Sequence, residues 1–331
     1  INHNELYETF LKVLLNHKVE ETEAKQLATI FTQNAADGVI SHSVSRFPLM
    51  ISYLDKGAIK PGTMPKLISA SETIEKWDAG FGFGVTSASF CMDRAIEIAS
   101  KHGVGITVAL HSNHWMRPGY YGWKAADKGF IGICWTTTRK NMVPWGGAER
   151  QLGNNPLVIA VPRKKGNLVF DSSMAQYAWG KVREYAADGK KLPTVGGYDS
   201  QGNLTDDALE IEKTYKAMPA GFWKGSALSI LLEAVACSLG QSSTVEDNEI
   251  YDDIETNMTQ VFMAIDPKVV NENYSEDNLD RIVEGLHNCP PKDGKTPVRY
   301  PGEKALKTRM KSEKNGIEIP KRSWENLKAL Q

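Results

Sequence analysis

The sequence predicts an α/β protein in which helices from both chain ends flank a central region that alternates strands with helices. Three observations support this: residues 1–65 repeat apolar side chains at helical spacing, residues 66–269 contain short apolar runs typical of buried strands, and residues 270–331 return to helical patterning. We therefore expect a helical domain built from 1–65 together with 270–331, and a mixed-sheet domain over 66–269.

Helices are predicted over 4–17, 20–36 and 45–56. Apolar side chains in each recur at three- or four-residue intervals, so each helix has one face to bury. Pro48 stands in the first turn of the third helix, where proline is tolerated. Residues 38–44 are expected to form the loop between the second and third helices.

The central region is predicted to hold several buried strands and the most apolar helix of the chain. Gly103 follows one helical stretch and favours the left-handed conformation of a helix C-terminus. Residues 196–203 are too polar and glycine-rich for a regular element. The expected strands are 105–110, 130–137, 157–161, 168–170 and 260–265, and the expected helices are 87–101, 120–128, 175–187, 226–239, 278–286 and most of the tail from residue 302.

Composition excludes several classes of protein. The chain has 331 residues, of which 41% are hydrophobic and 24% charged, a profile of globular rather than disordered or fibrous proteins. Its formal net charge is -1, so no overall field attracts nucleic acid or an anionic membrane, and we expect neither as a partner. The longest apolar-leaning run, 227–239, is interrupted by Glu233 and is too short to span a bilayer.

The four cysteines indicate a reducing compartment. They are scattered along the chain without a CxxC pair, which argues against a zinc ribbon and a disulfide framework. The first residues lack the basic and apolar segments of a secretory signal peptide. We therefore expect a cytoplasmic protein.

The common cofactor motifs are missing. Gly80, Gly82 and Gly84 are evenly spaced, but Val85 stands where GxGxxG requires its last glycine, and no parallel βαβ opening is expected here. The sequence also lacks GxxxxGK[ST], GxSxG and HExxH. A standard Rossmann fingerprint, a P-loop and an α/β-hydrolase are therefore rejected.

His42 is the strongest candidate for chemistry. It lies in the predicted loop 38–44, where Ser41 can hydrogen-bond its ring. Arg46 would fall in the first turn of the next helix, where a cation opposes the helix dipole, which suggests another reason for its presence. A histidine titrating near pH 7 beside an arginine that grips a carboxylate suits keto-acid reduction. In the alternative, Ser41 caps a helix and His42 is a surface residue.

A second cluster follows the predicted strand 105–110. His111 and His114 form an HxxH spacing, which could bind a metal, although no acidic residue or cysteine stands beside them. Trp115 and Tyr121 could line a pocket for a flat ring or belong to the core. We expect no metal site, and keep a metal-dependent hydrolase or lyase as an alternative.

Three further segments carry weaker signals. Gly153 and Asn154 belong to a turn whose N–H groups could hold an anion. Asp171 ends a predicted strand. Ser226 is a natural N-cap for the most apolar helix, and Lys224 would add charge to a phosphate site at that helix start.

In their order along most of the chain, these blocks resemble the malate/L-lactate dehydrogenase family, whose NAD(P) fold is not a Rossmann fold. Each piece is weak alone, and the combination is specific. The residues that carry the likeness are Asp37 and Gly38 with Ser41, His42 and Arg46; Asn113 and His114 with Gly119 and Tyr121; Gly153 with Asn155 and Pro156; Asp171; Lys224 and Gly225; and Pro301, Gly302 and Glu303.

The resemblance implies a homodimer, a mixed and mainly antiparallel central sheet, and a nicotinamide held between the two domains. It implies that His42 donates the proton and that Arg46 binds the substrate carboxylate. Ser41, His114 and Asn154 are then expected around the substrate. The dinucleotide is expected to contact Leu168, Val169, Phe170, Asp171 and Ser172, then Trp223 and Lys224, and finally Gly302, Glu303 and Lys304.

Departures from the family pattern bear on the substrate. Ser43 and Met116 stand where many members have glycine, and Asn154 replaces a threonine. Met116 with Arg117 suggests a pocket for a polyhydroxylated acid. The likeness is strongest to enzymes that use NADH to reduce a 2-keto sugar acid, 2,3-diketo-L-gulonate to 3-keto-L-gulonate, with hydride transfer to C2 and with NADPH possible. The alternatives are malate, lactate, ureidoglycolate or a cyclic imine acid as substrate, or a nucleotide-binding module without catalysis.

Overall fold

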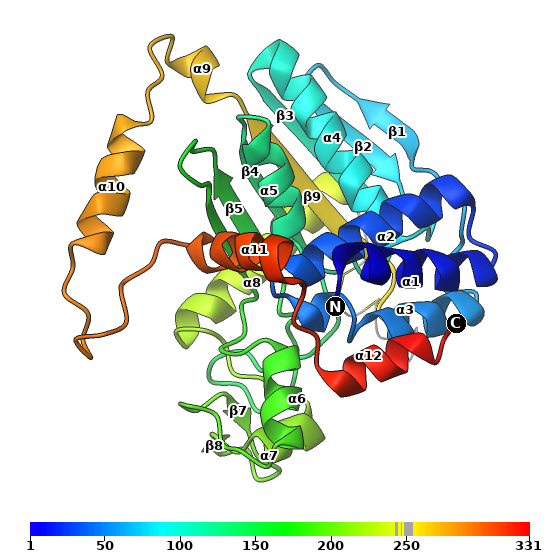
Figure 1. Cartoon of the computed structure of the whole chain (residues 1–331), viewed down its shortest axis with the longest axis vertical. Coiled ribbons are helices and arrows are strands. Elements are labelled where there is room, and N and C mark those ends of the chain that lie inside the picture. Colours follow the sequence, from blue (N-terminus) through cyan, green and yellow to red (C-terminus); the bar gives the residue numbers. More distant parts are fainter. Residues whose placement is uncertain (242–243, 246, 248–253) are drawn as a thin grey trace.

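A seven-stranded sheet forms the centre of the molecule (Figure 1). The computed structural model describes residues 1–241, 244–245, 247 and 254–331. Only β2 and β3 pair in parallel, so the mainly antiparallel sheet expected from the resemblance is confirmed. The strand order is β1 (Lys66–Ala70), β2 (Ile74–Asp78), β3 (Val104–Ser112), β9 (Met258–Ile265), β4 (Ile131–Thr136), β5 (Leu157–Val161) and β6 (Leu168–Ser172).

Helices cover both faces of this sheet. On one face, α4 (Gly84–His102) and α5 (Gly119–Asp127) bury a core that includes Trp115 and Phe262. On the other face, Leu232 of α8 (Trp223–Gly240) packs in a second core with Val108. Each covering helix has an apolar side, and the sheet face below it supplies the apolar surface against which that side is buried.

The first helices pack as a separate layer beside the sheet. In α1 (His3–Asn16), α2 (Glu21–Ala36) and α3 (Phe47–Asp55), apolar side chains meet in one core. The rings of Phe10, Phe31 and Phe47 meet there, with centroids 4.7 to 5.4 Å apart.

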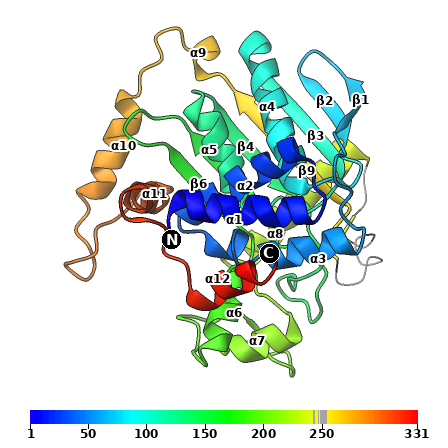
Figure 2. The ribbon, with the colours of Figure 1, turned by 45° about the vertical axis from the view of Figure 1, so that its right-hand side comes forward.

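The end of the chain returns to this layer. Helix α12 (Lys321–Lys328) packs against α1 and α3, as both views show (Figures 1 and 2). Helix α11 (Glu303–Asn315) contacts α2. By contrast, α10 (Asp277–His287) lies beside the connection between β5 and β6, where Asp280 pairs with Arg163. The proposed division into two domains stays a prediction.

The remaining elements are short. Helix α6 (Trp179–Ala187) falls within the predicted helix 175–187, and α7 (Ala208–Thr214) follows a two-stranded sheet of β7 (Gly197–Tyr198) and β8 (Leu204–Thr205). Strand β7 lies in 196–203, a stretch predicted to lack regular structure. Helix α6 begins later than predicted because Ala175 makes a β-bridge with Pro219. Helix α9 (Pro267–Val270) follows β9.

The glycine run 80–84 lies inside a βαβ unit, contrary to expectation. Strand β2, helix α4 and the parallel strand β3 form this unit. The start of α4 is nevertheless covered, because a Cβ atom on Gly84 would lie 2.0 Å from the carbonyl oxygen of Asn113. Backbone atoms of Asn113 and His114 therefore pack closely against Gly84 at this helix N-terminus.

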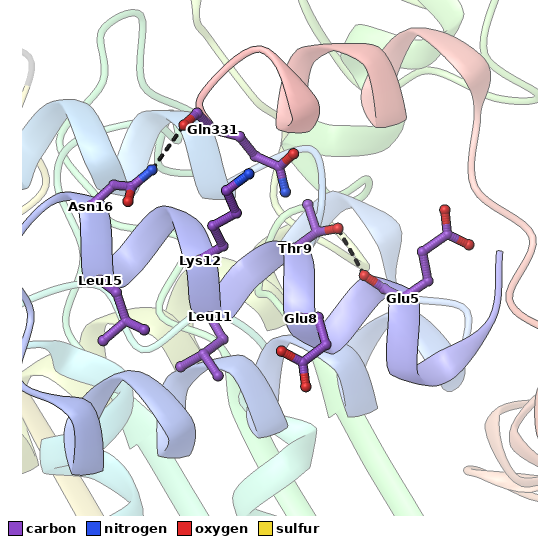
Figure 3. Close-up of a pocket in the computed structure, with 8 residues that line it drawn as sticks. All are labelled: Glu5, Glu8, Thr9, Leu11, Lys12, Leu15, Asn16 and Gln331. Atoms are coloured by element: carbon purple, nitrogen blue, oxygen red, sulfur yellow. Dashed lines mark hydrogen bonds between the residues drawn. The ribbon is translucent and has the colours of Figure 1, made fainter.

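Three further observations bear on function. No disulfide links the four cysteines, all of which lie in the described ranges. Of the helices that can be described, none has both the length and the apolar character needed to cross a bilayer. A hollow of about 500 Å³ on α1, lined by residues such as Leu11 and Leu15 and by Gln331 (Figure 3), contains none of the predicted site residues.

Candidate active site

The structure brings His42 and His114 face to face. His42 ends a 3₁₀ turn, Ile40–His42, in the segment predicted as an open loop, and His114 follows β3. The two rings are stacked with centroids 6.0 Å apart and planes inclined by 16°. Ser41 Oγ lies 3.1 Å from His42 Nδ1, as the sequence suggested, and the Met116 N–H donates to His114 Nδ1 at 3.0 Å. Across the described residues no hydrogen bond engages either Nε2, so both remain available to a ligand.

Both histidines are neutral at pH 7, which corrects the expectation of a ring titrating near pH 7. Burial, followed by the charges of Arg46 and Arg117, lowers the pKa of His42 to about 4. Burial, followed by Arg46 and His42, holds the pKa of His114 well below its ordinary value. A neutral imidazole with a free Nε2–H donates a hydrogen bond to a carbonyl oxygen without carrying charge.

Arg46 stands beside this pair and is already paired with a carboxylate. It is the N-cap residue of α3, just outside the first turn where it was predicted. Its guanidinium contacts Glu255 Oε2, and both side chains are largely buried. Glu255 therefore explains how a cation is tolerated near this helix N-terminus. Sequence analysis missed Glu255 because nothing near it in the chain indicates a partner.

Arg117 does not line an open pocket, contrary to the suggestion from the sequence. Its side chain is 4% exposed, and its Nη1 donates to Asp37 Oδ2. Arg309 donates to the same carboxylate from Nε at 2.7 Å and from Nη2 at 2.8 Å. Gln33 Nε2 donates to Asp37 Oδ1 at 2.8 Å. We call Gln33, Asp37, Arg117 and Arg309 the Asp37 cluster.

The three segments expected to bind a dinucleotide lie next to one another. The Val169 N–H in β6 donates to Pro301 O at 2.8 Å, which places Gly302 against the strand. Gly302 has φ 95°, and a Cβ there would lie 3.0 Å from Val169 N. The Ala220 N–H donates to Met174 O at 2.8 Å, so the start of α8 packs just beyond β6.

Side chains on these three segments differ in whether they are free to contact a ligand. Lys224 and Lys304 are exposed, and no ion pair holds either of them in the described part of the chain. Trp223 and Phe170 are also exposed, while Leu168 and Ser172 are the half-buried ends of β6. The Glu303 carboxylate is committed inside the protein: it accepts from His287 Nε2, Lys307 Nζ and the Tyr300 N–H.

Asp171 lies where β6 meets the start of α5. Its Oδ2 accepts the Gly119 N–H at 2.9 Å and lies 4.0 Å from Arg117 Nε. Desolvation raises the pKa of Asp171, and the Arg117 charge and the Gly119 hydrogen bond oppose that rise. A carboxylate at a helix N-terminus is a favourable arrangement.

The remaining predicted residues have internal partners. Asn154 Oδ1 accepts from Thr138 Oγ1 at 3.0 Å and from Asn141 Nδ2 at 2.9 Å, so its role toward a substrate stays a prediction. Ser226 lies within α8, which begins at Trp223, and is not its N-cap. Its hydroxyl instead accepts the Trp145 N–H at 3.2 Å.

The two histidines of the HxxH spacing have different partners and do not form one site. His111 Nδ1 lies 2.9 Å from Asp78 Oδ1 on β2, whereas His114 stacks on His42. Among the residues whose positions are described, no group of three or more His, Cys, Asp or Glu could hold a metal ion. Trp115 and Tyr121 are buried and stacked in the core, and do not line a pocket.

With the site described, comparison with known proteins identifies the family. The sequence profile of malate/L-lactate dehydrogenase matches residues 1–328. The chain belongs to this family. It is therefore an oxidoreductase, and membership implies a nicotinamide cofactor in general.

Relatives and solved structures agree with this assignment. Two curated relatives named 2,3-diketo-L-gulonate reductase, from Pasteurella multocida and Haemophilus influenzae, are 38% and 39% identical over 100% of this chain and 99% of their own length. The malate dehydrogenase of Entamoeba histolytica has a TM-score of 0.92 at 26% identity, covering 100% of this chain and 96% of its own. The sulfolactate dehydrogenase of Methanocaldococcus jannaschii has a TM-score of 0.89 at 27% identity, with the same coverage.

Proposed function

We propose that the chain reduces a 2-keto sugar acid with NADH, converting 2,3-diketo-L-gulonate to 3-keto-L-gulonate. The observation that carries the proposal is the stacked histidine pair, with no hydrogen bond to either Nε2 among the described residues, beside a largely buried arginine. The names of the full-length curated relatives support the choice of substrate.

The segments around β6 fit a nicotinamide dinucleotide. Its pyrophosphate needs cations and a close approach to backbone, and Lys224, Lys304 and Gly302 offer both. Its flat rings need apolar surfaces, and Trp223 and Phe170 are exposed on the same segments. When bound, the reduced nicotinamide supplies the hydride that adds to the carbonyl carbon.

Arg46 has the chemistry to orient the substrate. Its guanidinium can hold a carboxylate through two parallel hydrogen bonds, which fixes which carbonyl faces the hydride. Because Glu255 already contacts Arg46, a substrate carboxylate must share or replace that contact. His114 can donate from Nε2 to an oxygen of the substrate, because its Nδ1 accepts the Met116 N–H.

His42 supplies the proton that completes the reduction. Its pKa of about 4 leaves it neutral in the free protein at pH 7. A substrate carboxylate on Arg46 offsets one of the cations that lower this pKa, so binding favours proton uptake by His42. The protonated ring then donates to the oxygen as negative charge develops there, a step that contributes roughly 10² to 10⁴-fold in rate.

The homodimer expected from the resemblance has a candidate interface on α8. Large apolar side chains on this helix are exposed, and a helix that is apolar all round normally has a second partner. We propose that a second copy of the chain covers them, and a Leu231→Glu variant should then elute as a monomer. Apart from Trp223, which is assigned to the cofactor, the exposed residues are Leu228, Ile230, Leu231, Val235 and Leu239. The unbridged thiols support a cytoplasmic location, which we also propose.

The test of the proposed function is NADH oxidation by the purified protein with 2,3-diketo-L-gulonate. Oxaloacetate, pyruvate, a cyclic imine acid and NADPH run in parallel, and the reverse reaction is run with malate, lactate and ureidoglycolate. Fast turnover with only the diketo acid and NADH supports the full proposal. Turnover on the simpler acids instead would refute the sugar-acid substrate, and turnover only with NADPH would refute the cofactor preference. NADH binding without turnover would favour a non-catalytic module.

A further inference from the structure

Arg117 occupies a position between two carboxylates from different parts of the fold. It lies in the connection between β3 and α5, one residue beyond Met116, whose N–H donates to His114 Nδ1. Its Nη1 donates to Asp37, which ends α2 just before the segment that carries His42. Its Nε lies 4.0 Å from Asp171 on β6 and makes no hydrogen bond, although it is buried.

The Nη1 and Nε groups of Arg117 differ in whether they have a hydrogen-bond partner, and packing alone does not explain this difference. Asp37 would remain satisfied without Arg117, because Arg309 and Gln33 make three hydrogen bonds to it. A buried guanidinium with an unsatisfied N–H costs free energy, so burial in this orientation is not explained by stability. The unsatisfied Nε faces the Asp171 carboxylate, whose other partner is the Gly119 N–H.

We propose that Arg117 is a positioning residue of the reductase site, where its buried charge links the His42 segment to the Asp171 carboxylate of β6. This inference rests on the proposed function in taking His42 and Asp171 as parts of one site. Arg117 sets their charge states together: it disfavours the imidazolium of His42 and favours the ionised form of Asp171.

The other charges near these groups come from separate elements. His42 is faced by Arg46, the N-cap residue of α3, and by the ring of His114. Asp171 is faced by the Gly119 N–H of α5 and by the buried Cys134 thiol of β4. Arg117 is the cation that acts on both His42 and Asp171. Its removal should therefore raise both pKa values, whereas removal of Arg46 should act on His42.

The test compares Arg117→Met with Arg309→Met. Both variants remove an arginine from the Asp37 cluster, but Arg309 packs over the Trp123 ring and is not among the charges that shift His42 or Asp171. The imidazoles are followed by NMR titration in the ligand-free protein, with His42 assigned by the signal missing from His42→Gln. We expect Arg117→Met to raise the His42 midpoint by about half a pH unit. Arg309→Met should lower stability without moving that midpoint.

Arg117→Lys keeps the charge and should restore the wild-type midpoint. If Arg117→Met does not fold, Arg117→Gln removes the charge, keeps a side-chain donor beside Asp37 and its pairing with Arg309, and gives the same titration. A His42 midpoint that Arg117→Met leaves in place, or that Arg309→Met moves equally, would overturn the inference.

The activity measurement separates this inference from the proposed function. In Arg117→Met the pH profile of kcat/KM for reduction should move to higher pH, by up to about one unit where Asp171 sets the limb, because Arg117 lies 4.0 Å from that carboxylate. A wild-type protein that reduces no keto acid refutes the proposed function and leaves the NMR titration to decide on Arg117. An active wild type with an unshifted Arg117→Met profile refutes the role of Arg117 alone.

Discussion

The Asp37 cluster and the histidine pair meet the two ends of one short segment, at Asp37 and at His42, but their charges behave in opposite ways. Burial alone would raise the pKa of Asp37, yet hydrogen bonds from Arg309 and the charge and hydrogen bond of Arg117 hold it below its ordinary value. His42 and His114 each have one hydrogen bond at Nδ1, and burial lowers their pKa values until both are neutral. A buried group keeps its charge only where partners offset the desolvation penalty. The histidine pair has fewer hydrogen-bond partners than Asp37, and its two Nε2 atoms are left free to contact a substrate.

The strongest way to break this comparison is Asp37→Ala. The substitution leaves Arg117 and Arg309 without their shared carboxylate, and an uncompensated buried charge costs roughly 3–5 kcal/mol. The free energy of unfolding, measured by urea denaturation, should fall by that amount. Asp188→Ala is the matched control, because Asp188 pairs with Lys190 at the surface and its loss should cost less than about 1 kcal/mol. Equal losses in the two variants would contradict the comparison.

His42→Gln tests the opposite end of the segment. Loss of the proton donor should lower kcat for keto-acid reduction by roughly 10² to 10⁴-fold. Thermal stability at pH 7 should stay near wild type, because the neutral ring has one side-chain hydrogen bond to lose. His111→Gln, which removes a histidine paired with Asp78 outside the site, should keep wild-type turnover. Wild-type kcat in His42→Gln would remove the proposed role.

The lowered pKa of His42 also predicts loss of stability in acid. The unfolded chain binds a proton with a pKa of 6.5, and the folded protein binds it at about 4, so stability falls as pH decreases through that window. The contribution of this one group is on the order of 3 kcal/mol at most. Unfolding free energies at a series of pH values between 7 and 4 measure it, and His42→Gln should flatten the dependence. An equally steep dependence in His42→Gln would assign the effect to other groups, with His114 the first to test.

The smallest expected effect concerns the Arg46–Glu255 pair. If a substrate carboxylate must share or replace this contact, Glu255→Gln should lower KM for the keto acid by up to about fivefold, which corresponds to about 1 kcal/mol of competition removed from Arg46. Glu97→Gln, which alters the exposed pair with Arg94, is the control and should leave KM unchanged. A raised KM would instead make Glu255 a support that orients Arg46.

Local sequence patterns predicted helices and strands well where buried side chains recur at a regular spacing. Three early helices, five of the strands and the left-handed Gly103 at the end of α4 were expected from spacing and turn chemistry. The expectation failed where a distant partner decides the conformation. Helix α8 starts at Trp223 rather than after Ser226, because the Ser226 hydroxyl is used by the Trp145 N–H.

The same division holds at the site. His42 with Ser41, and the order of segments that identifies the family, could be predicted because the residues that matter are neighbours in sequence. Glu255 beside Arg46, and the burial of Arg117, could not, because each depends on a contact between elements far apart in the chain.

By itself, the sequence determined the family, the periodic elements and the residue types available for reduction. The tertiary structure alone decided which of those residues carry charge. The physical reason is that ionisation depends on solvent exclusion and on partners brought from distant segments, as the neutral His42 and the ionised Asp37 show within one short stretch of chain.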